Sequence, residues 1–249
     1  MIIYDNERVD SVNDSLSLIQ KPDGLTFGTD ALLLAGYVSG KYNLGAELGG
    51  GSGIISMLLL TRNKLDTCTA YEIQDEYTDL ILRNAEYNSL SDRLTAVCLD
   101  VRDLPASEKC DIVFTNPPYM KSTSGKSNES DKKAIARHEV HGDIRDFAAS
   151  AKRMLKFGGS FYAVYRPDRL TDIVAAMRES GIEPKRMTFV HADTESEASM
   201  VLIEGKRGGK SGMQLTKPLI IYKDKLHKEY RDEMNYIMEN GSFPPEYKR

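Results

Sequence analysis

The sequence has no tryptophan, only three cysteines and only four histidines in 249 residues. The cysteines stand at positions 68, 98 and 110 and form no CxxC pair, so neither a zinc site nor a disulfide framework is predicted. No apolar run reaches the roughly 18 residues of a membrane-spanning helix, and the N-terminus lacks the charged-then-apolar pattern of a secretory leader. We therefore expect a cytoplasmic protein with no metal and no contact with a membrane.

A strong excess of positive charge is also missing, because the net charge is −4. No global basic field therefore favours nucleic acid, although a local basic surface is not excluded. The 41% hydrophobic content is enough for one sizeable core in a chain of this length, and no repeat or long linker divides it. We expect a monomer whose single domain spans 1–249, with a hairpin at 1–28, a core at 29–205, and a basic loop and charged tail at 206–249.

Strand-like and helix-like patterns alternate through the middle of the chain. The expected strands are 44–48, 67–73, 94–99, 111–115 and 160–165, and the expected helices are 53–61, 75–88, 143–157 and 168–180. Two late strands, 186–191 and 199–204, follow with no helix between them. This order predicts an α/β fold with a doubly wound, mostly parallel sheet and one antiparallel strand at its edge.

The most specific feature is the motif Asn116-Pro117-Pro118-Tyr119, which directly follows the apolar strand 111–115. Two prolines cannot continue a central strand or a helix interior, so the chain must leave the sheet here. It then displays an amide oxygen and a backbone carbonyl that can both accept hydrogen bonds from one planar –NH2 group, and an aromatic ring that can stack on it. The motif indicates a holder for an amine such as adenine N6 or a carboxamide. The alternative is a rigid turn with Tyr119 covering the core.

A glycine-rich turn lies between the first core strand and its helix. Gly49, Gly51 and Gly53 permit positive φ and let a ligand approach the backbone, where the following helix directs free N–H groups. On its own, such a turn is equally well explained as a tight connection.

Acidic residues at the ends of the first three strands indicate which kind of ligand the turn would bind. Glu72 suits a ribose diol, and Asp100 could accept from an adenine amino group, although either alone could be a solvated strand-end acid. The dinucleotide pattern GxGxxG is incomplete, because Ile54 or Ser56 stands where its last glycine is needed. The carboxylate of Glu47 disfavours a pyrophosphate and suits a ligand that carries an ammonium and a sulfonium.

The acid followed by Gly49-x-Gly51-x-Gly53, together with NPPY, resembles the class I methyltransferases that use S-adenosylmethionine (AdoMet) and methylate amino nitrogens. The resemblance covers about residues 25 to 205. It implies a seven-stranded Rossmann-like sheet with the last strand antiparallel, AdoMet over the first two strand ends, and the target amine at the NPPY motif. S-adenosylhomocysteine would be the product.

Within that group the chain resembles the bacterial enzymes that methylate N6 of the adenine 3′ of the anticodon in a valine tRNA. The similar features are the short N-terminal hairpin and three segments, F-G-T-D-A at 27–31, A-R-H-E at 136–139 and S-M-V-L-I-E at 199–204. The resemblance therefore implies tRNA as the partner. The charged C-terminal tail has no counterpart that we can match.

The resemblance also implies roles for individual residues. AdoMet would contact Thr29, Asp30, Glu47, Gly49, Gly51, Gly53, Glu72, Ile73, Asp100, Val101 and Asn116, and catalysis would involve Asn116, Pro117, Pro118 and Tyr119. RNA would be held by Lys121, Lys126, Lys132, Lys133, Arg137, His138, Lys206 and Arg207, with help from Lys210. Each lysine alone could be a solvated surface charge, and His138 with Glu139 could be a helix-end pair.

The implied reaction is direct displacement at the AdoMet methyl group, which requires positioning and no strong general base. Protein-glutamine methyltransferases also use NPPY, but they usually carry an N-terminal helical domain, and only about 40 residues precede the glycine turn here. Another nucleic-acid amino methyltransferase is a further alternative. A Rossmann-like nucleotide-binding protein without transferase activity is the alternative from a different class.

Overall fold

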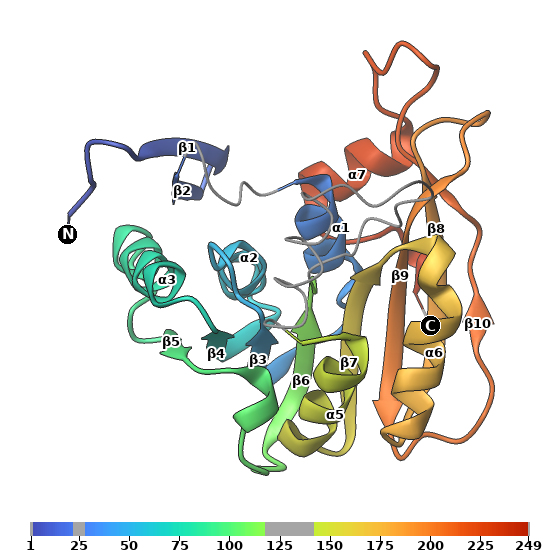
Figure 1. Ribbon diagram of the computed structural model, residues 1–249. Coiled ribbons are helices and arrows are strands. Elements are labelled where there is room, and N and C mark those ends of the chain that lie inside the picture. Colours follow the sequence, from blue (N-terminus) through green and yellow to red (C-terminus); the bar gives the residue numbers. More distant parts are fainter. Residues whose placement is uncertain (1, 22–27, 118–141, 249) are drawn as a thin grey trace, which may run out of the picture.

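A nine-stranded sheet forms the centre of the molecule (Figure 1). The computed structural model describes residues 2–21, 28–117 and 142–248. The strands of this sheet are β3 (Tyr42–Leu48), β4 (Leu65–Glu72), β5 (Leu94–Cys98), β6 (Cys110–Thr115), β7 (Leu155–Tyr165), β8 (Ile182–His191), β9 (Ala198–Arg207), β10 (Gln214–Leu215) and β11 (Leu219–Ile220). The helices are α1 (Thr29–Tyr37), α2 (Ile54–Thr61), α3 (Asp75–Tyr87), α5 (Ile144–Met154), α6 (Leu170–Glu179) and α7 (Asp232–Asn240).

The order of the strands confirms the predicted doubly wound sheet. It runs β10-β8-β9-β7-β6-β3-β4-β5, with β11 also paired to β8. Among the described strands of this sheet, only β9 runs antiparallel to its neighbours. From β3, the strands β4 and β5 therefore follow outward in one direction, and β6, β7 and the β8–β9 pair follow in the other, so the direction changes between β3 and β6.

Two details of the sheet differ from the sequence prediction. The antiparallel strand β9 does not lie at an edge, because it pairs with β7 on one side and with β8 on the other. The edge is instead formed by β10 and β11, which bring the count to nine rather than seven. These strands have two residues each, which is too short for an alternating pattern to be recognised in the sequence.

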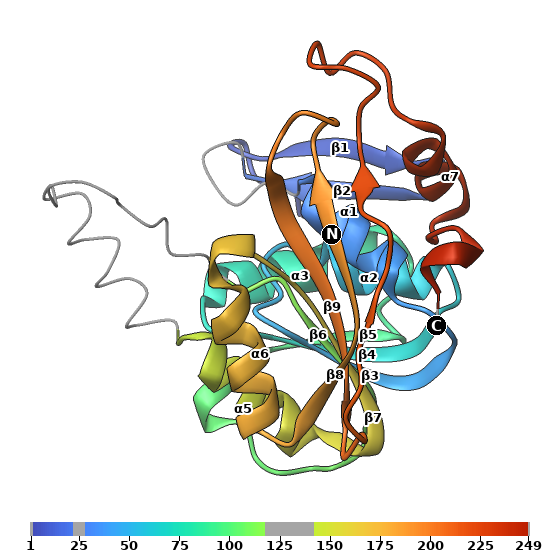
Figure 2. The ribbon, with the colours of Figure 1, turned by 90° about the vertical axis from the view of Figure 1, so that its right-hand side faces the viewer.

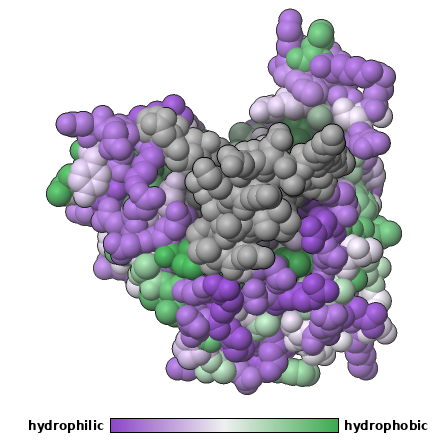
Figure 3. Space-filling model, in the orientation of Figure 1, coloured by the Kyte–Doolittle hydropathy of each residue, from purple (hydrophilic) through white to green (hydrophobic). Residues whose placement is uncertain are grey.

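Helices cover both faces of the sheet (Figures 1 and 2). On one face, α1, α2 and α3 share a core with Ile112 and Phe114 of β6, and on the other face, α5 and α6 share a core with Val113. Alternate residues of a central strand thus enter different cores, which explains its continuous apolar sequence. Hydrophilic residues predominate on the described surface in Figure 3. None of the described helices is long and apolar enough to cross a membrane.

The N-terminal strands β1 (Arg8–Asn13) and β2 (Leu16–Gln20) form a separate antiparallel hairpin that packs against α3. Asn84 accepts a hydrogen bond from the backbone N–H of Ile19 (2.7 Å) and donates one to its carbonyl (3.1 Å). Asn88 makes the same two contacts with Ser17, at 3.0 and 2.7 Å. The hairpin is therefore attached to the helix through its backbone.

The C-terminal segment is part of the core. The helix α7 in this segment covers Asp232–Asn240. Arg186, which is fully buried, donates to the backbone carbonyls of Tyr247 (2.7 Å) and Tyr37 (2.8 Å) and forms an ion pair with Glu204 at 2.8 Å. A guanidinium with several acceptors thus ties the chain end to α1 and to the sheet.

Candidate functional site

The carboxyl ends of the parallel strands meet at one edge of the sheet, and the predicted motifs follow four of them. The glycine turn follows β3, Glu72 ends β4, Asp100 lies two residues beyond β5, and Asn116 directly follows β6. The register pairs Leu48 at the end of β3 with both neighbouring strands, so these ends lie level with one another. Fold topology therefore assembles the site from distant parts of the sequence.

The glycine turn is folded back over the end of β4. Gly49, Gly51 and Gly53 have φ of +72°, +54° and +80°, a region that favours glycine. The N–H groups of Gly49 and Gly50 donate to the Tyr71 carbonyl at 2.9 and 3.1 Å. The left-handed residues bring the backbone of this turn close to the edge where a ligand would lie.

Glu72 and Asp100 hold the connections around the turn. The two carboxylate oxygens of Glu72 accept from the N–H groups of Gly51 (2.9 Å) and Gln74 (3.0 Å), and its side chain is buried. Asp100 accepts from the N–H of Arg102 at 2.8 Å and pairs with its guanidinium at 2.5 Å. Since each carboxylate oxygen has two lone pairs, both acids can accept from a ligand as well.

Glu47 lies beneath the glycine turn and does not face the edge. It is 1% exposed and accepts from the N–H of Ser56 at 3.2 Å and from its hydroxyl. Burial raises the pKa of Glu47 to about 8, the Ser56 hydrogen bonds oppose this, and the nearby charge of Glu72 adds to it. The structure thus places this acid against the first turn of α2, where it binds a backbone N–H of the helix.

Asn116 emerges at the end of β6 with a half-buried side chain, and Pro117 is buried behind it. Its amide nitrogen Nδ2 donates to Oδ2 of Asp30 at 2.7 Å. Thr115, the last residue of β6, donates through its hydroxyl to the Leu48 carbonyl at 2.7 Å and so joins β6 to β3 at this level. Pro118 and Tyr119 lie outside the described residues.

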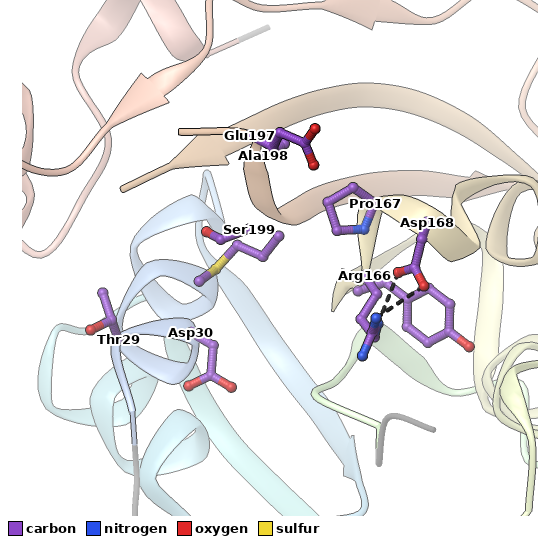
Figure 4. A pocket seen from close by; sticks show the side chains of 10 residues that line it. Thr29, Asp30, Arg166, Pro167, Asp168, Glu197, Ala198 and Ser199 are labelled. Carbon is purple, nitrogen blue, oxygen red and sulfur yellow. Dashed lines mark hydrogen bonds and ion pairs between the residues drawn. The ribbon is translucent and has the colours of Figure 1, made fainter. Parts of the chain in front are cut away.

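A cavity of about 960 Å³ opens beside Asp30 (Figure 4). Its walls come from the start of α1, from the residues after β7, and from the start of β9. The lining residues are Thr29, Asp30, Tyr165, Arg166, Pro167, Asp168, Glu197, Ala198, Ser199 and Met200. Because Asp30 both lines this cavity and binds Asn116, the cavity adjoins the proposed amine holder.

The chemistry of the cavity is rich in hydrogen-bond acceptors. Asp30, Asp168 and Glu197 contribute carboxylates, and Arg166 is paired with Asp168 at 2.8 Å. The wall after β7 and the start of β9 were not predicted from the sequence. A usable signal was present for the first of these, since Arg166-Pro167-Asp168 is a polar segment directly after a predicted strand.

The structure does not bring every predicted residue to this edge. Lys206 and Arg207 end β9, which runs antiparallel, so they lie at the opposite edge of the sheet. Arg207 there pairs with Glu108 at 2.6 Å. Ile73 directly follows Glu72, and the buried Val101 begins a short 3-10 helix after Asp100. Several predicted RNA contacts, and Glu139 beside them, lie outside the described residues. These contacts are Lys121, Lys126, Lys132, Lys133, Arg137 and His138.

Comparison with known proteins identifies the class. The family model described as "RMKL-like, methyltransferase domain" matches residues 56–198, and the chain belongs to this family. The protein is therefore a methyltransferase, as the sequence analysis predicted. Among the described residues no group of three or more His, Cys, Asp or Glu side chains is arranged to hold a metal ion.

Two similar proteins carry the same name. A tRNA1(Val) (adenine(37)-N6)-methyltransferase from Dyadobacter fermentans is 25% identical over 178 residues, which are 71% of this chain and 73% of that protein. The enzyme of the same name from Aeromonas hydrophila is 27% identical over 184 residues, 73% of this chain and 76% of the other.

Two solved structures show the same fold. A predicted O-methyltransferase from Agrobacterium tumefaciens has a TM-score of 0.70 and 23% identity, and the match covers 86% of this chain and 98% of that one. Pyrococcus horikoshii TYW2 in complex with MeSAdo has a TM-score of 0.58 and 15% identity, and the match covers 83% and 73%.

Proposed function

We propose that this methyltransferase transfers the methyl group of AdoMet to N6 of an adenine in tRNA, the adenine 3′ of the anticodon in a valine tRNA. The observation that carries the proposal is Asn116, displayed at the end of β6 between the glycine turn after β3 and the acceptor-rich cavity. The names of the relatives from Dyadobacter fermentans and Aeromonas hydrophila support the choice of acceptor. Such an enzyme would work in the cytoplasm, where its substrate is.

The residues at the edge fit AdoMet. The turn at Gly49, Gly51 and Gly53 exposes backbone at a strand end, and Glu72 and Asp100 follow neighbouring strands with oxygens suited to ribose hydroxyls and an adenine amine. When bound, AdoMet supplies a methyl group on a sulfonium, which is a good leaving group. The protein's own task is then to hold the acceptor amine in line with that methyl group.

Asn116 and Pro117 would hold the acceptor. The amide oxygen Oδ1 of Asn116 and the Pro117 carbonyl would each accept one N–H of the adenine amino group. These hydrogen bonds raise electron density on a nitrogen whose lone pair is otherwise delocalised into the ring. They become stronger as the nitrogen turns pyramidal and acidic in the transition state, so they favour the transition state over the bound substrate.

The cavity beside Asp30 would receive the rest of the acceptor nucleoside. Its volume of about 960 Å³ lies at the upper end of the range for small-molecule sites. The carboxylates of its walls can accept from ribose hydroxyls and from base N–H groups. A base can enter such a cavity only when it is unstacked, as bases in RNA loops are.

Replacing Asn116 tests the proposal. Asn116→Ala should lower the methylation rate about a hundredfold or more, since it removes a hydrogen bond that strengthens in the transition state. AdoMet affinity, measured by calorimetry, should change by less than about threefold. The assay uses labelled AdoMet with total tRNA, followed by nucleoside mass spectrometry for N6-methyladenosine. Near wild-type methylation by this variant would contradict the proposal.

The matched control is Asn240→Ala, which removes an exposed asparagine at the end of α7 and should leave the rate unchanged. Label found in protein rather than RNA would favour a glutamine acceptor. Tight NADH binding without AdoMet binding would contradict the assignment of the cofactor.

A further inference from the structure

The contact between Asp30 and Asn116 joins residues that are far apart in the sequence. Nδ2 of Asn116 donates to Oδ2 of Asp30 at 2.7 Å across a separation of 86 positions. Asp30 lies in the first turn of α1 and Asn116 just beyond β6. Both side chains are half-buried, and Asp30 also lines the cavity.

This contact decides which way the amide of Asn116 faces. The oxygen and the nitrogen of an asparagine amide have nearly the same shape, and only their hydrogen-bond partners distinguish the two orientations. A carboxylate accepts hydrogen bonds and cannot donate them. The group facing Asp30 must therefore be the NH2 group, and Oδ1 lies on the other side of the amide, away from the carboxylate.

Asp30 is itself held in place. Its second oxygen, Oδ1, accepts from the N–H of Ala31 at 2.9 Å. The helix that carries it is anchored by Leu33 and Leu34, both fully buried. A negative charge in the first turn also interacts favourably with the helix dipole. The carboxylate is thus a fixed reference against which a neighbouring amide can be oriented.

We propose that Asp30 is a positioning residue for methyl transfer, which orients the Asn116 amide so that its oxygen faces the acceptor amine. This inference rests on the proposed function. It differs from the expectation that Asp30 contacts AdoMet, because its effect passes through Asn116. Without the carboxylate the amide can turn over and present its NH2 group to the NH2 group of the acceptor, where two donors face each other.

The first test is Asp30→Asn, which keeps the shape of the side chain but can both donate and accept. The turnover rate at saturating AdoMet should fall about tenfold to a hundredfold, the range expected for a misplaced hydrogen bond to a charged group. AdoMet affinity should stay within about threefold of wild type. A loss of AdoMet affinity with an unchanged turnover rate would overturn the inference and leave Asp30 as a cofactor ligand.

The matched control is Asp232→Asn, which removes an acid from the first turn of α7. It reproduces the loss of charge at a helix start without touching Asn116. Its turnover rate should equal that of the wild type.

An exchange of the two side chains gives a sharper test. Asn116→Asp alone sets two carboxylates against each other and should be strongly impaired. In the double variant Asn116→Asp/Asp30→Asn, the new amide at position 30 donates to the new carboxylate at position 116, whose other oxygen faces the acceptor. The double variant should be at least about tenfold more active than Asn116→Asp, a non-additivity that reports direct coupling. A double variant no better than Asn116→Asp would overturn the inference.

A measurement without turnover separates this inference from the proposed function. The side-chain amide of Asn116 can be assigned by nuclear magnetic resonance from its loss in Asn116→Asp. We expect one of its protons to be shifted downfield and to exchange slowly with water, and both features should disappear in Asp30→Ala. An unchanged amide signal would overturn the inference, whether or not tRNA is methylated. An inactive wild-type enzyme with the expected signals would instead contradict the choice of acceptor.

Discussion

Glu47 and Asn116 both stand near the carboxyl ends of central strands, yet their side chains point in different directions. Asn116 lies beyond the last residue of β6 and binds Asp30, which lines the cavity, whereas Glu47 is the second-last residue of β3 and faces α2. Within a strand, alternate side chains point to opposite faces of the sheet. Glu47, inside its strand, is therefore covered by a helix, whereas Asn116, just beyond its strand, lies at the edge of the sheet.

The buried Glu47 predicts a pH dependence of stability. Its pKa of about 8 in the folded protein lies above that of the unfolded chain, so the folded state holds its proton more tightly. This contribution is present below the unfolded pKa and is lost as pH rises toward 8. The free energy of unfolding should fall by roughly 1 kcal/mol per pH unit in the upper part of that window.

Glu47→Gln should remove this slope, because glutamine keeps the hydrogen-bond acceptor and does not titrate. The measurement is urea unfolding of both AdoMet-free proteins at several pH values. The free energy of unfolding of the wild type is then subtracted from that of the variant at each pH. Parallel curves for the two proteins would show that Glu47 is already ionised in the folded state.

The sequence could predict where the residues of the candidate site stand along the strands, but not the direction of their side chains. The places of Glu72, Asp100 and Asn116 could be predicted because these residues end or follow predicted strands, and parallel strands bring such ends together. The contact between Asp30 and Asn116 could not be predicted, since it depends on how α1 packs across the sheet. Lys206 was predicted to lie with the other strand ends, but it lies at the opposite edge of the sheet. The reason is that β9 runs in the reverse direction, which carries its C-terminal end away from them.

At the scale of elements, the end of α1 is held by a lysine from another segment. Nζ of Lys64 donates to the carbonyls of Ala35, Gly36 and Val38 at 3.0, 3.2 and 2.7 Å. Burial lowers the pKa of Lys64 to about 7, and the charges of Arg62 and Arg186 add to this. The last carbonyls of a helix lack partners within the helix, and here a buried amine supplies them.

Lys64→Met should therefore destabilise the fold by about 2 kcal/mol, since it removes the amine that donates to the carbonyls of Ala35 and Val38 while keeping most of the apolar stem. Denaturant unfolding measures the effect. Lys41→Met, at an exposed lysine shortly after α1, is the control and should change stability by less than about 0.5 kcal/mol. Equal effects of the two substitutions would rule out the capping role.

Element order was predictable where helix and strand patterns alternate, and the parallel sheet follows from it. The position of β9 inside the sheet could not be predicted. A hairpin can add its two strands to a sheet in either order, and sequence patterns do not distinguish the two orders. The same limit applies to β10 and β11, whose pairing with β8 depends on contacts formed after the sheet exists.

At the scale of the whole molecule, the chain end completes the core on the α1 face. Phe243 is 1% exposed and meets the ring of Tyr37 edge-on at 5.3 Å between centroids. Tyr247 packs against Phe243 in the same way. The charged composition of residues 223–249 conceals these apolar contacts, which explains why the sequence suggested a tail.

Phe243→Ala should lower the free energy of unfolding by about 3 to 4 kcal/mol, because it opens a cavity in this core. The matched control is Phe157→Ala, at a phenylalanine that is 79% exposed, which should change stability by less than about 1 kcal/mol. Thermal and denaturant unfolding measure both variants. A small effect at Phe243 would mean that the chain end folds independently of the core.

The N-terminal hairpin is attached to α3 at positions where the distance between residues along the helix is close to the distance between residues along the strand. Asn84 and Asn88 are four residues apart, about 6 Å along a helix, and their partners Ile19 and Ser17 are two residues apart, about 6.7 Å along a strand. The two amides therefore imitate a third strand and occupy the open side of a two-stranded ribbon that would be marginal alone. A slip of β2 by one residue would turn its N–H and C=O groups away from both amides, so the helix fixes the register of the hairpin that it binds.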